Sequence, residues 1–158
     1  MPGYFEVTTF AAGPVDIKDL TAAKEYFVGK VVSTEKVVQD TAAAAKGVDW
    51  GSDKGMYRVS VMCDIKTTQK IAISRATNVE FRIYDSADDA TFGTDPVMTH
   101  IVPISLLNEA RKTPICFSFL STTKRYFCMS FKFTGGSATT TDRATAGQLL
   151  ITANPSVY

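Results

Sequence analysis

The chain has 158 residues, a length that fits one domain, and we expect residues 1–158 to form a single domain. Its 17 Lys and Arg residues nearly cancel its 16 Asp and Glu residues, which leaves a net charge of +1. That balance excludes a protein that holds nucleic acid through bulk positive charge, because phosphate contacts need a clustered basic surface. A hydrophobic content of 45% with 21% charged residues excludes a disordered chain.

The shapes of the side chains indicate the fold class. The sequence has 20 Thr, 14 Val and 9 Ile against only 6 Leu, and it adds 10 Phe and 6 Tyr. Side chains that branch at Cβ lose rotamer freedom in a helix and pack well on a pleated sheet, and aromatic residues are also enriched in strands. The composition therefore predicts an all-β protein and excludes a helix bundle.

The N-terminal part of the chain predicts an arm followed by a short helix. Residues 1–15 form the arm, which contains a short alternating segment and ends at a Gly-Pro pair. Asp16 can cap a short helix that runs to about residue 27, with one apolar side. The residues on that side are Ile17, Leu20 and Phe27. The alternative is that the aromatic residues at 26–27 already begin a strand.

The rest of the chain predicts about eight strands. The clearest is 78–84, where Val79, Phe81 and Ile83 alternate with charged residues, as expected for a strand with one buried face. The other expected strands are 31–38, 56–63, 70–74, 97–104, 114–120, 125–133 and 147–153. Turn-rich connections at 41–55, 85–96 and 134–143 and a helical turn at 105–110 separate them.

The order of these elements predicts the architecture. Strands follow one another without the regular alternation of strands and helices that a parallel sheet requires. We therefore expect a two-sheet β-sandwich that resembles a jelly roll, formed by residues 16–158 after the arm.

The inventory of catalytic residues is small. His100 is the only histidine, so a site built from several histidines is excluded within one chain. It lies in an expected strand without a nucleophile motif nearby, and we interpret it as a structural or surface residue. Cys63, Cys116 and Cys128 form no C-x-x-C pair and lie in apolar strands, which is typical of packing thiols in a reducing compartment. The sequence predicts no enzyme and no cofactor.

An acidic loop is the one candidate for a metal site. It carries Asp85, Asp88, Asp89 and Asp95, and calcium prefers oxygen ligands of this kind. The spacing does not match an EF-hand, and aspartates also enter turns because their side chains bond to nearby backbone N–H groups. Turn formation is the favoured interpretation, and calcium binding at Asp85, Asp88 and Asp89 is the alternative.

Four aromatic residues lie outside the clear strands and are candidate interface anchors. They are Tyr4, Phe5, Phe10 and Trp50. An aromatic side chain buries a large area when it docks on a partner, at little cost in conformational entropy. The alternative is that these residues cover the ends of the sandwich.

Four segments from residue 56 to the C-terminus follow one another in a recognisable series. A strand runs into an acidic turn in NVEFRIYDSADDATF, and two strands joined by a proline link follow in VMTHIVPISLLNEARKTPICFSF. A further strand and a Gly/Thr loop form KRYFCMSFKFTGGSAT, and the closing strand is AGQLLITANPS. Over about 100 residues this series resembles the jelly-roll cement (decoration) proteins of tailed-phage capsids. Residues 1–55 depart from the family's pattern.

The resemblance implies a virion structural protein. Such a protein binds the outer surface of a capsid, stabilises contacts between major capsid protein subunits and often forms a trimer. We expect assembly in the host cytoplasm, since the chain shows neither a signal sequence nor an apolar run near about 18 residues. Neither nucleic acid nor a membrane is an expected partner. The alternative functions are a carbohydrate-binding jelly roll, as in an adhesin or receptor-binding domain, and a small hydrolytic or cupin-like enzyme.

Overall fold

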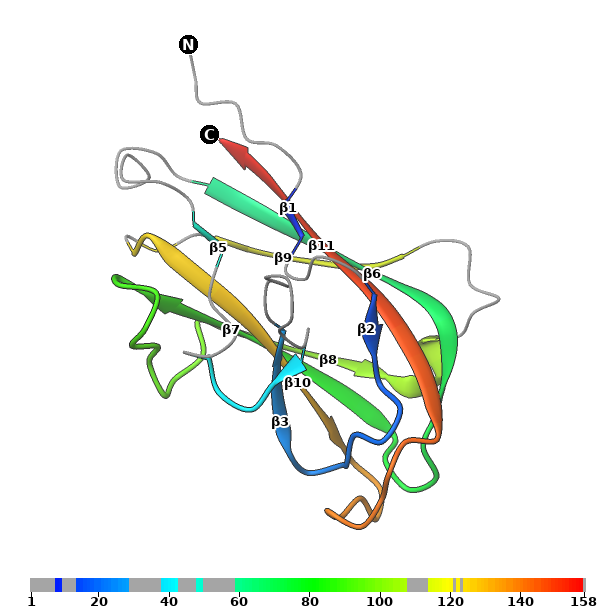
Figure 1. Ribbon diagram of the computed structural model, residues 1–158. Coiled ribbons are helices and arrows are strands. Elements are labelled where there is room, and N and C mark those ends of the chain that lie inside the picture. Colours follow the sequence, from blue (N-terminus) through cyan, green and yellow to red (C-terminus); the bar gives the residue numbers. More distant parts are fainter. Residues whose placement is uncertain are drawn as a thin grey trace.

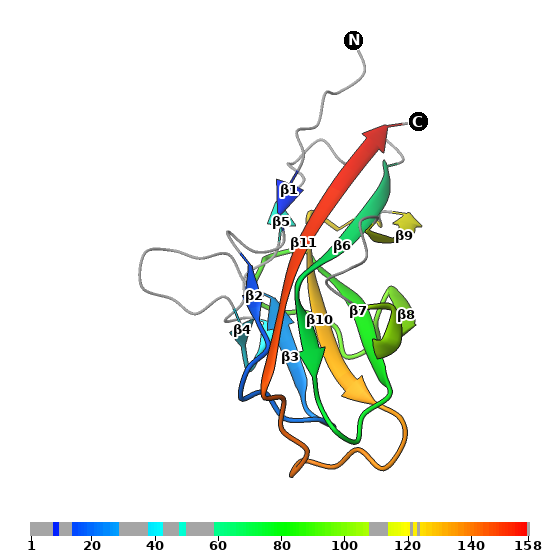
Figure 2. The same cartoon turned by 90° about the vertical axis from the view of Figure 1, so that its right-hand side faces the viewer.

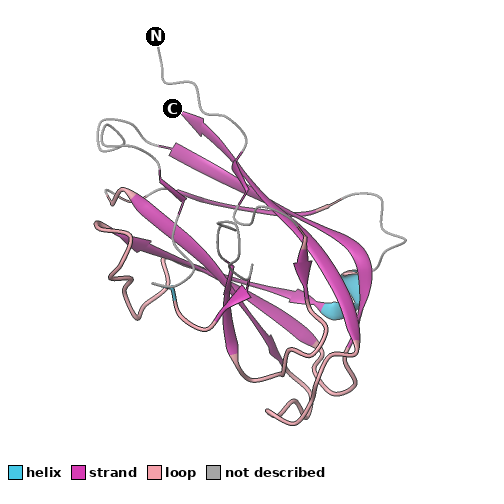
Figure 3. Cartoon of the chain, in the orientation of Figure 1, coloured by secondary structure: helices cyan, strands magenta, loops and turns pink. Residues whose placement is uncertain are grey.

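The computed structural model describes most of the chain as two β-sheets that face each other (Figure 1). It describes residues 8–9, 14–28, 38–42, 48–49, 59–107, 114–120, 122 and 124–157. Figure 3 shows strands and loops in nearly all of these residues, with a helical turn after one of the strands. The prediction of an all-β, two-sheet sandwich is therefore confirmed.

One sheet has five strands and the other has six. The five-stranded sheet contains β1 (Thr8–Thr9), β2 (Val15–Asp16), β6 (Val59–Ala72), β9 (Ile115–Leu120) and β11 (Ala146–Val157). The six-stranded sheet contains β3 (Glu25–Val28), β4 (Val38–Gln39), β5 (Val48–Asp49), β7 (Asn78–Ser86), β8 (Met98–Pro103) and β10 (Tyr126–Thr134). The 3₁₀ helix η2 (Ile104–Leu106) follows β8.

The strand order is that of a jelly roll. The first sheet runs β1-β11-β6-β9 with β2 also paired to β11, and the second runs β4-β3-β10-β7-β8 with β5 paired to β10. If β1, β4 and β5 are set aside, the remaining eight strands have the orders 1-8-3-6 and 2-7-4-5, and every pair is antiparallel. Successive strands thus cross from one sheet to the other except at the β7–β8 pair, as in a double-sheet jelly roll.

The core lies between the sheets and follows the period of two. In β7 the side chains of Val79, Phe81 and Ile83 are at most 1% exposed, as the alternation predicts. On β10 the residues Met129, Phe131 and Phe133 are completely buried, and aromatic pairs such as Phe119 with Phe127 bridge the layers. Burying each large apolar side chain contributes about 1.5–3 kcal/mol, so this layer stabilises both sheets together.

The expected helix at 16–27 is wrong. The structure places β2, a turn and β3 there instead. Val15 and Ile17 are both fully buried with the exposed Asp16 between them, which is the alternation of a strand. The turn then requires left-handed backbone at Asp19 (φ 71°) and Ala23 (φ 61°), which a right-handed helix cannot contain. The alternative of a strand at 26–27 is confirmed by β3.

Two segments that were predicted as separate strands contribute to one long strand. Residues 59–63 and 70–72 of the two expected segments belong to the single long strand β6, which pairs with β11 along its length, whereas residues 56–58 lie outside the described residues and 73–74 follow the strand. The buried Ile65 and Thr67 continue its inward face, although the surrounding residues are polar. The expected helical turn at 105–110 begins one residue earlier, as η2, and residues 108–110 lie outside the described part of the chain. Of the expected strand 31–38, only Val38 is described, at the start of β4.

The N-terminal arm contributes strands to a sheet. Thr8 and Thr9 pair with Ala153 and Thr152 of β11, and Val15 pairs further along the same strand. The boundary expected at residue 15 therefore falls inside β2.

A buried carboxylate ties together two loops at one end of the sandwich. Asp142 is 3% exposed and accepts hydrogen bonds from Ser74 Oγ and from the backbone N–H groups of Arg75 and Ala76, at 2.7–3.1 Å. Gly136, with φ 57°, lies so close to Arg75 that an added Cβ would be 2.5 Å from the Arg75 carbonyl oxygen. These contacts fix the β6–β7 turn against the β10–β11 loop.

Candidate interaction surface

The aromatic anchors predicted from the sequence lie outside the described residues. Tyr4, Phe5, Phe10 and Trp50 all fall there, so their role at an interface stays a prediction.

The carboxylates of the acidic loop are used in hydrogen bonds and an ion pair. Asp85 Oδ2 accepts a hydrogen bond from Thr122 Oγ1 at 2.5 Å, and Asp85 Oδ1 lies 3.4 Å from Lys124 Nζ. These contacts join the end of β7 to the segment that enters β10. Asp85 therefore faces a hydroxyl and an ammonium group.

Asp88 organises the turn that follows β7. Its Oδ1 accepts the backbone N–H groups of Thr91 and Ala90, at 2.7 and 3.0 Å, and the hydroxyl of Ser86 at 2.8 Å. The hydrogen bond from Thr91 is the main reason that the pKa of Asp88 lies well below its ordinary value of 3.8. Asp89 stands in left-handed backbone with φ 58°. Over the part of the chain that is described, no three His, Cys, Asp or Glu residues are placed to hold a metal ion.

The single histidine packs against an aromatic ring. The His100 imidazole stacks on Phe117 with the ring centroids 4.8 Å apart and the planes at 22°. This contact joins β8 of one sheet to β9 of the other.

The three thiols differ in exposure. Cys63 and Cys128 are at most 1% exposed, and burial raises the pKa of Cys63 to about 12 and that of Cys128 further. Cys116 is exposed on β9 and its thiol donates a hydrogen bond to Asp64 Oδ1 at 2.9 Å, which raises its pKa. A raised pKa reduces the thiolate fraction that nucleophilic catalysis needs.

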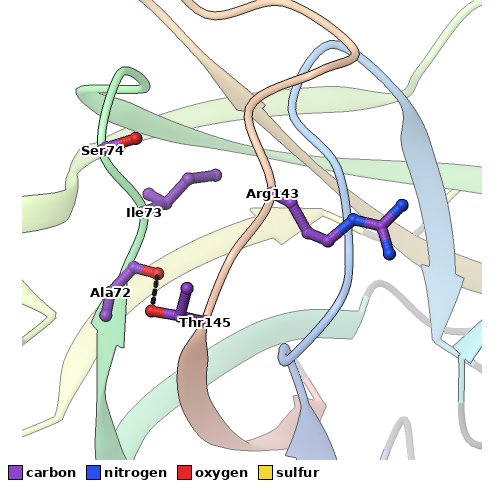
Figure 4. A pocket seen from close by; sticks show the side chains of 5 residues that line it. All are labelled: Ala72, Ile73, Ser74, Arg143 and Thr145. Atoms are coloured by element: carbon purple, nitrogen blue, oxygen red, sulfur yellow. Dashed lines mark hydrogen bonds between the residues drawn. The ribbon is translucent and has the colours of Figure 1, made fainter.

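A shallow hollow of about 260 Å³ lies where β6 ends and β11 begins (Figure 4). It is lined by Ala72, Ile73, Ser74, Arg143 and Thr145. Figure 4 shows the guanidinium of Arg143 directed away from the other four side chains. Ligand pockets usually exceed about 300 Å³ and carry several convergent polar groups, and this hollow has neither property.

A polar network covers part of the outer face of the six-stranded sheet. Glu25 Oε1 on β3 accepts hydrogen bonds from Tyr84 at 2.6 Å and Ser130 at 2.5 Å. Arg82 lies between two carboxylates, 3.6 Å from Glu25 Oε2 and 3.1 Å from Glu80 Oε1. Burial and the hydrogen bond to Glu25 raise the pKa of Tyr84. The network joins β3, β10 and β7 on that face.

On one side of the sandwich, the two strands that the structure describes contain no formally charged residue. They are β8 and β9, which end the two sheet orders (Figure 2). Residues 97–106, which include β8 and η2, and residues 115–120, which form β9, contain no Asp, Glu, Lys or Arg. We call these two segments the neutral side.

The large apolar side chains that the structure exposes gather on or beside the neutral side. They are Met62, Val97, Ile101, Leu106 and Leu120. Ile101 is 57% exposed, Leu120 is 55% exposed, and Met62 on β6 is 48% exposed directly opposite Ser118 of β9. Ile101 lies opposite Glu80 on the outer face of the six-stranded sheet, whereas Met62 and Leu120 lie on the outer face of the five-stranded sheet. The exposed apolar residues therefore flank the two strand edges on both faces, and such residues beside unprotected edges can mark an interaction site.

The opposite side of the sandwich is rich in charge. Figure 2 shows β2 and β4 there, across the molecule from β8 and β9. We call the charged residues of β2, of the turn after it and of the residue after β4 the charged side. They are Asp16, Lys18, Asp19, Lys24 and Asp40, and Lys24 Nζ lies 3.0 Å from Asp40 Oδ1.

Comparison of the chain with protein-family models, with curated proteins and with solved structures finds no match. None of the helical segments that the structure describes has the length and apolar character needed to cross a membrane. The neutral side is the feature that sequence reasoning missed. Its signal was present, because the stretches 97–107 and 114–120 lack charged residues.

Proposed function

We propose that this chain is a capsid cement protein, a non-enzymatic virion protein that binds the outer surface of a phage capsid. There it stabilises contacts between major capsid protein subunits. The observation that carries the proposal is the neutral side of the jelly roll, where the edge strands β8 and β9 contain no charged residue and exposed apolar side chains flank them.

The physical argument concerns exposed strand edges. Proteins usually protect the edge of a sheet with charged side chains, prolines or bulges, because an unprotected edge pairs with other chains. Here Pro103 at the end of β8 is the only such device within the strands of the neutral side. A surface of this kind is stable in solution when another protein covers it, and a rigid sandwich suits a protein that holds neighbours together.

The capsid as the partner rests on the resemblance in sequence. The four segments of that resemblance occupy β7 with its loop, β8 to β9, β10 with its loop, and β11, in that order. Jelly rolls also occur in viral capsid proteins and in lectins, so the fold is compatible with the proposal. The resemblance also implies trimers at or near the local threefold axes of a capsid, so the trimer is proposed for the capsid-bound protein.

A carbohydrate-binding jelly roll is the second candidate. The network of Glu25, Arg82 and Glu80 lies beside the ring pair of Phe27 and Tyr84, whose centroids are 5.9 Å apart. Carboxylates and guanidinium groups can bind sugar hydroxyls, and aromatic rings can stack on sugar faces. A glycan array tests this candidate, and an array on which the protein binds no glycan removes it.

The test of the capsid proposal uses capsids from which the protein has been removed or omitted. We expect purified protein to bind them saturably and to raise the melting temperature of the shells. Ile101→Lys places a charge at the centre of the neutral side and should weaken binding by tenfold or more, equivalent to about 1.4 kcal/mol.

Ser137→Lys is the matched control for that experiment. It adds the same charge at an exposed position in the turn after β10, and binding should be unchanged. Wild-type protein that does not bind the capsids saturably contradicts the capsid proposal. Equal binding by Ile101→Lys and wild type contradicts the use of the neutral side.

A further inference from the structure

We propose that β9 pairs edge to edge with β9 of a second copy of this chain, about a twofold axis. The contact includes the β9 flank, which we define as the outward residues Cys116, Ser118 and Leu120. This inference goes beyond the capsid proposal, because it concerns the free protein and requires no capsid.

The free edge of β9 is suited to pairing. Among the strands that the structure describes, β9 ends its sheet, and it pairs with β6 in unbroken register, from Ser60 with Leu120 to Ile65 with Ile115. In an antiparallel ladder, alternate residues direct their N–H and C=O groups away from the existing partner. β9 contains no proline and no charged residue that would oppose an added strand.

The outward face of β9 is apolar and small. Leu120 and Met62 are about half exposed and stand diagonally across the β6–β9 pair, about 7–8 Å apart at the backbone. The charge directly across the sheet from β9 is that of Asp64, one strand inward, and it accepts the Cys116 thiol proton in a hydrogen bond. A partner strand at the edge therefore meets no charge on β9 itself.

The inward face holds the strand in place. Phe117 stacks on His100 and lies 6.0 Å from Phe81, and Phe119 packs edge-on against Phe127 at 5.4 Å. These contacts fix β9 before any partner arrives. A pre-organised edge loses little conformational entropy when it pairs, which favours association.

A second copy fits this edge better than a charged segment would. A strand that carries charged side chains would place them beside Leu120, and they would lose part of their hydration. The chain's own β9 supplies an uncharged edge of equal length with the same alternation of faces. Pairing of identical strands also closes after two copies, as in an isologous dimer.

The sheet geometry limits the register. A twofold axis perpendicular to the sheet keeps the outward side chains of both copies on the same face, and directly opposite residues in a ladder share a face. Outward residues must therefore face outward residues. With the axis near the centre of the strand, Ser118 lies opposite either Ser118 or Cys116 of the second copy.

The first experiment measures the mass of the free protein by light scattering. We expect wild type to have twice the mass of the 17.2 kDa chain and Leu120→Lys to have half the wild-type mass. Ile101→Lys is the matched control, because it makes the same change at an equally exposed apolar residue on β8 and should leave the dimer intact.

A wild-type mass of one or three chains overturns this inference, as does a dimer that survives in Leu120→Lys. A monomer that still binds capsids overturns the inference and leaves the capsid proposal standing. If the mass stays that of a monomer but Leu120→Lys loses capsid binding, the occupant of the edge is a capsid segment and the inference is wrong.

The second experiment tests the register. Ser118→Cys, at an exposed position, should form an intermolecular disulfide on mild oxidation, because a cysteine of the second copy stands opposite it in both registers. Lys70→Cys, exposed at the far end of β6, should not. Equal crosslinking of the two variants, or none in Ser118→Cys, contradicts the edge pairing.

Discussion

The two long sides of the sandwich differ in the residues that they expose to solvent. On the charged side, β2, the turn after it and the residue after β4 carry five charged residues, with an ion pair between Lys24 and Asp40. On the neutral side, β8 and β9 expose apolar side chains and have no charge. Both sides rest on the same buried aromatic layer, so stability does not require the difference. The difference therefore supports the proposal that another protein covers the neutral side.

The largest expected effect comes from removing the ring that braces the neutral side. Phe117→Ala should lower the free energy of unfolding by about 3–5 kcal/mol, because it leaves a cavity between β9, β8 and β7. Denaturant unfolding measures this loss. The variant should also lose self-association.

Tyr26→Ala is the counterpart near the charged side, where the Tyr26 ring stacks on Phe131 at 5.8 Å. We expect a comparable loss of stability with self-association retained wherever the variant is folded. Dimer loss in Tyr26→Ala to the same extent as in Phe117→Ala would remove the distinction between the two sides.

The next effect concerns the polar network between the two sides. Tyr84 and Ser130 are 4% and 0% exposed, and their hydroxyl groups both donate to Glu25. Glu25→Ala removes that acceptor. The expected cost is about 1–3 kcal/mol in the free energy of unfolding. Glu25→Gln keeps one oxygen acceptor and should lose less. An unchanged stability in Glu25→Ala would show that the network does not hold β3 to β10 and β7.

A pH-dependent effect belongs to the turn that leads into the neutral side. The folded-state pKa of Asp88 is depressed, so its contribution to stability is present above the unfolded value near 3.8 and is lost as the pH falls below it. Asp88→Ala should therefore be less stable than wild type at neutral pH, with the difference shrinking below pH 3.8. Thermal melts across this range measure it, and a difference that grows on acidification contradicts the assignment.

The smallest effect is expected on the charged side. Lys24→Met removes the ion pair between Lys24 and Asp40, whose side chains are 49% and 76% exposed. Solvent-exposed ion pairs contribute little to the free energy of unfolding, and self-association should not change. Denaturant unfolding and light scattering check both points. A loss of the dimer in Lys24→Met would show that the interface involves the charged side, which contradicts the account.

The sequence predicted the parts of the fold where polarity alternates clearly. β7 is the best case, because Glu80 and Arg82 separate its buried residues. The predicted helix at 16–27 was wrong because the deciding feature, left-handed backbone at Asp19 and Ala23, does not follow from residue type. The middle of β6 was missed because Thr67 is buried there although threonine is polar.

The candidate surface could be predicted only in part. The absence of charge in 97–107 and 114–120 is a property of the sequence. That these segments form the free edges of two facing sheets is a property of the jelly-roll order, which pairs β8 with β7 and β9 with β6. Likewise, the aspartates of the acidic loop were seen as a group, whereas Thr122 and Lys124, which bind Asp85, are remote in sequence.

The most direct test of the central claim is amide hydrogen exchange on the wild-type protein, in its self-associated form and bound to capsids. The account predicts that amide exchange in residues 98–106 and 115–120 is slower in the assembled wild type than in Leu120→Lys. Exchange in β2, β3 and β4 should be the same in both. Slowed exchange confined to β2 and β4, or no change at β8 and β9, would contradict the account.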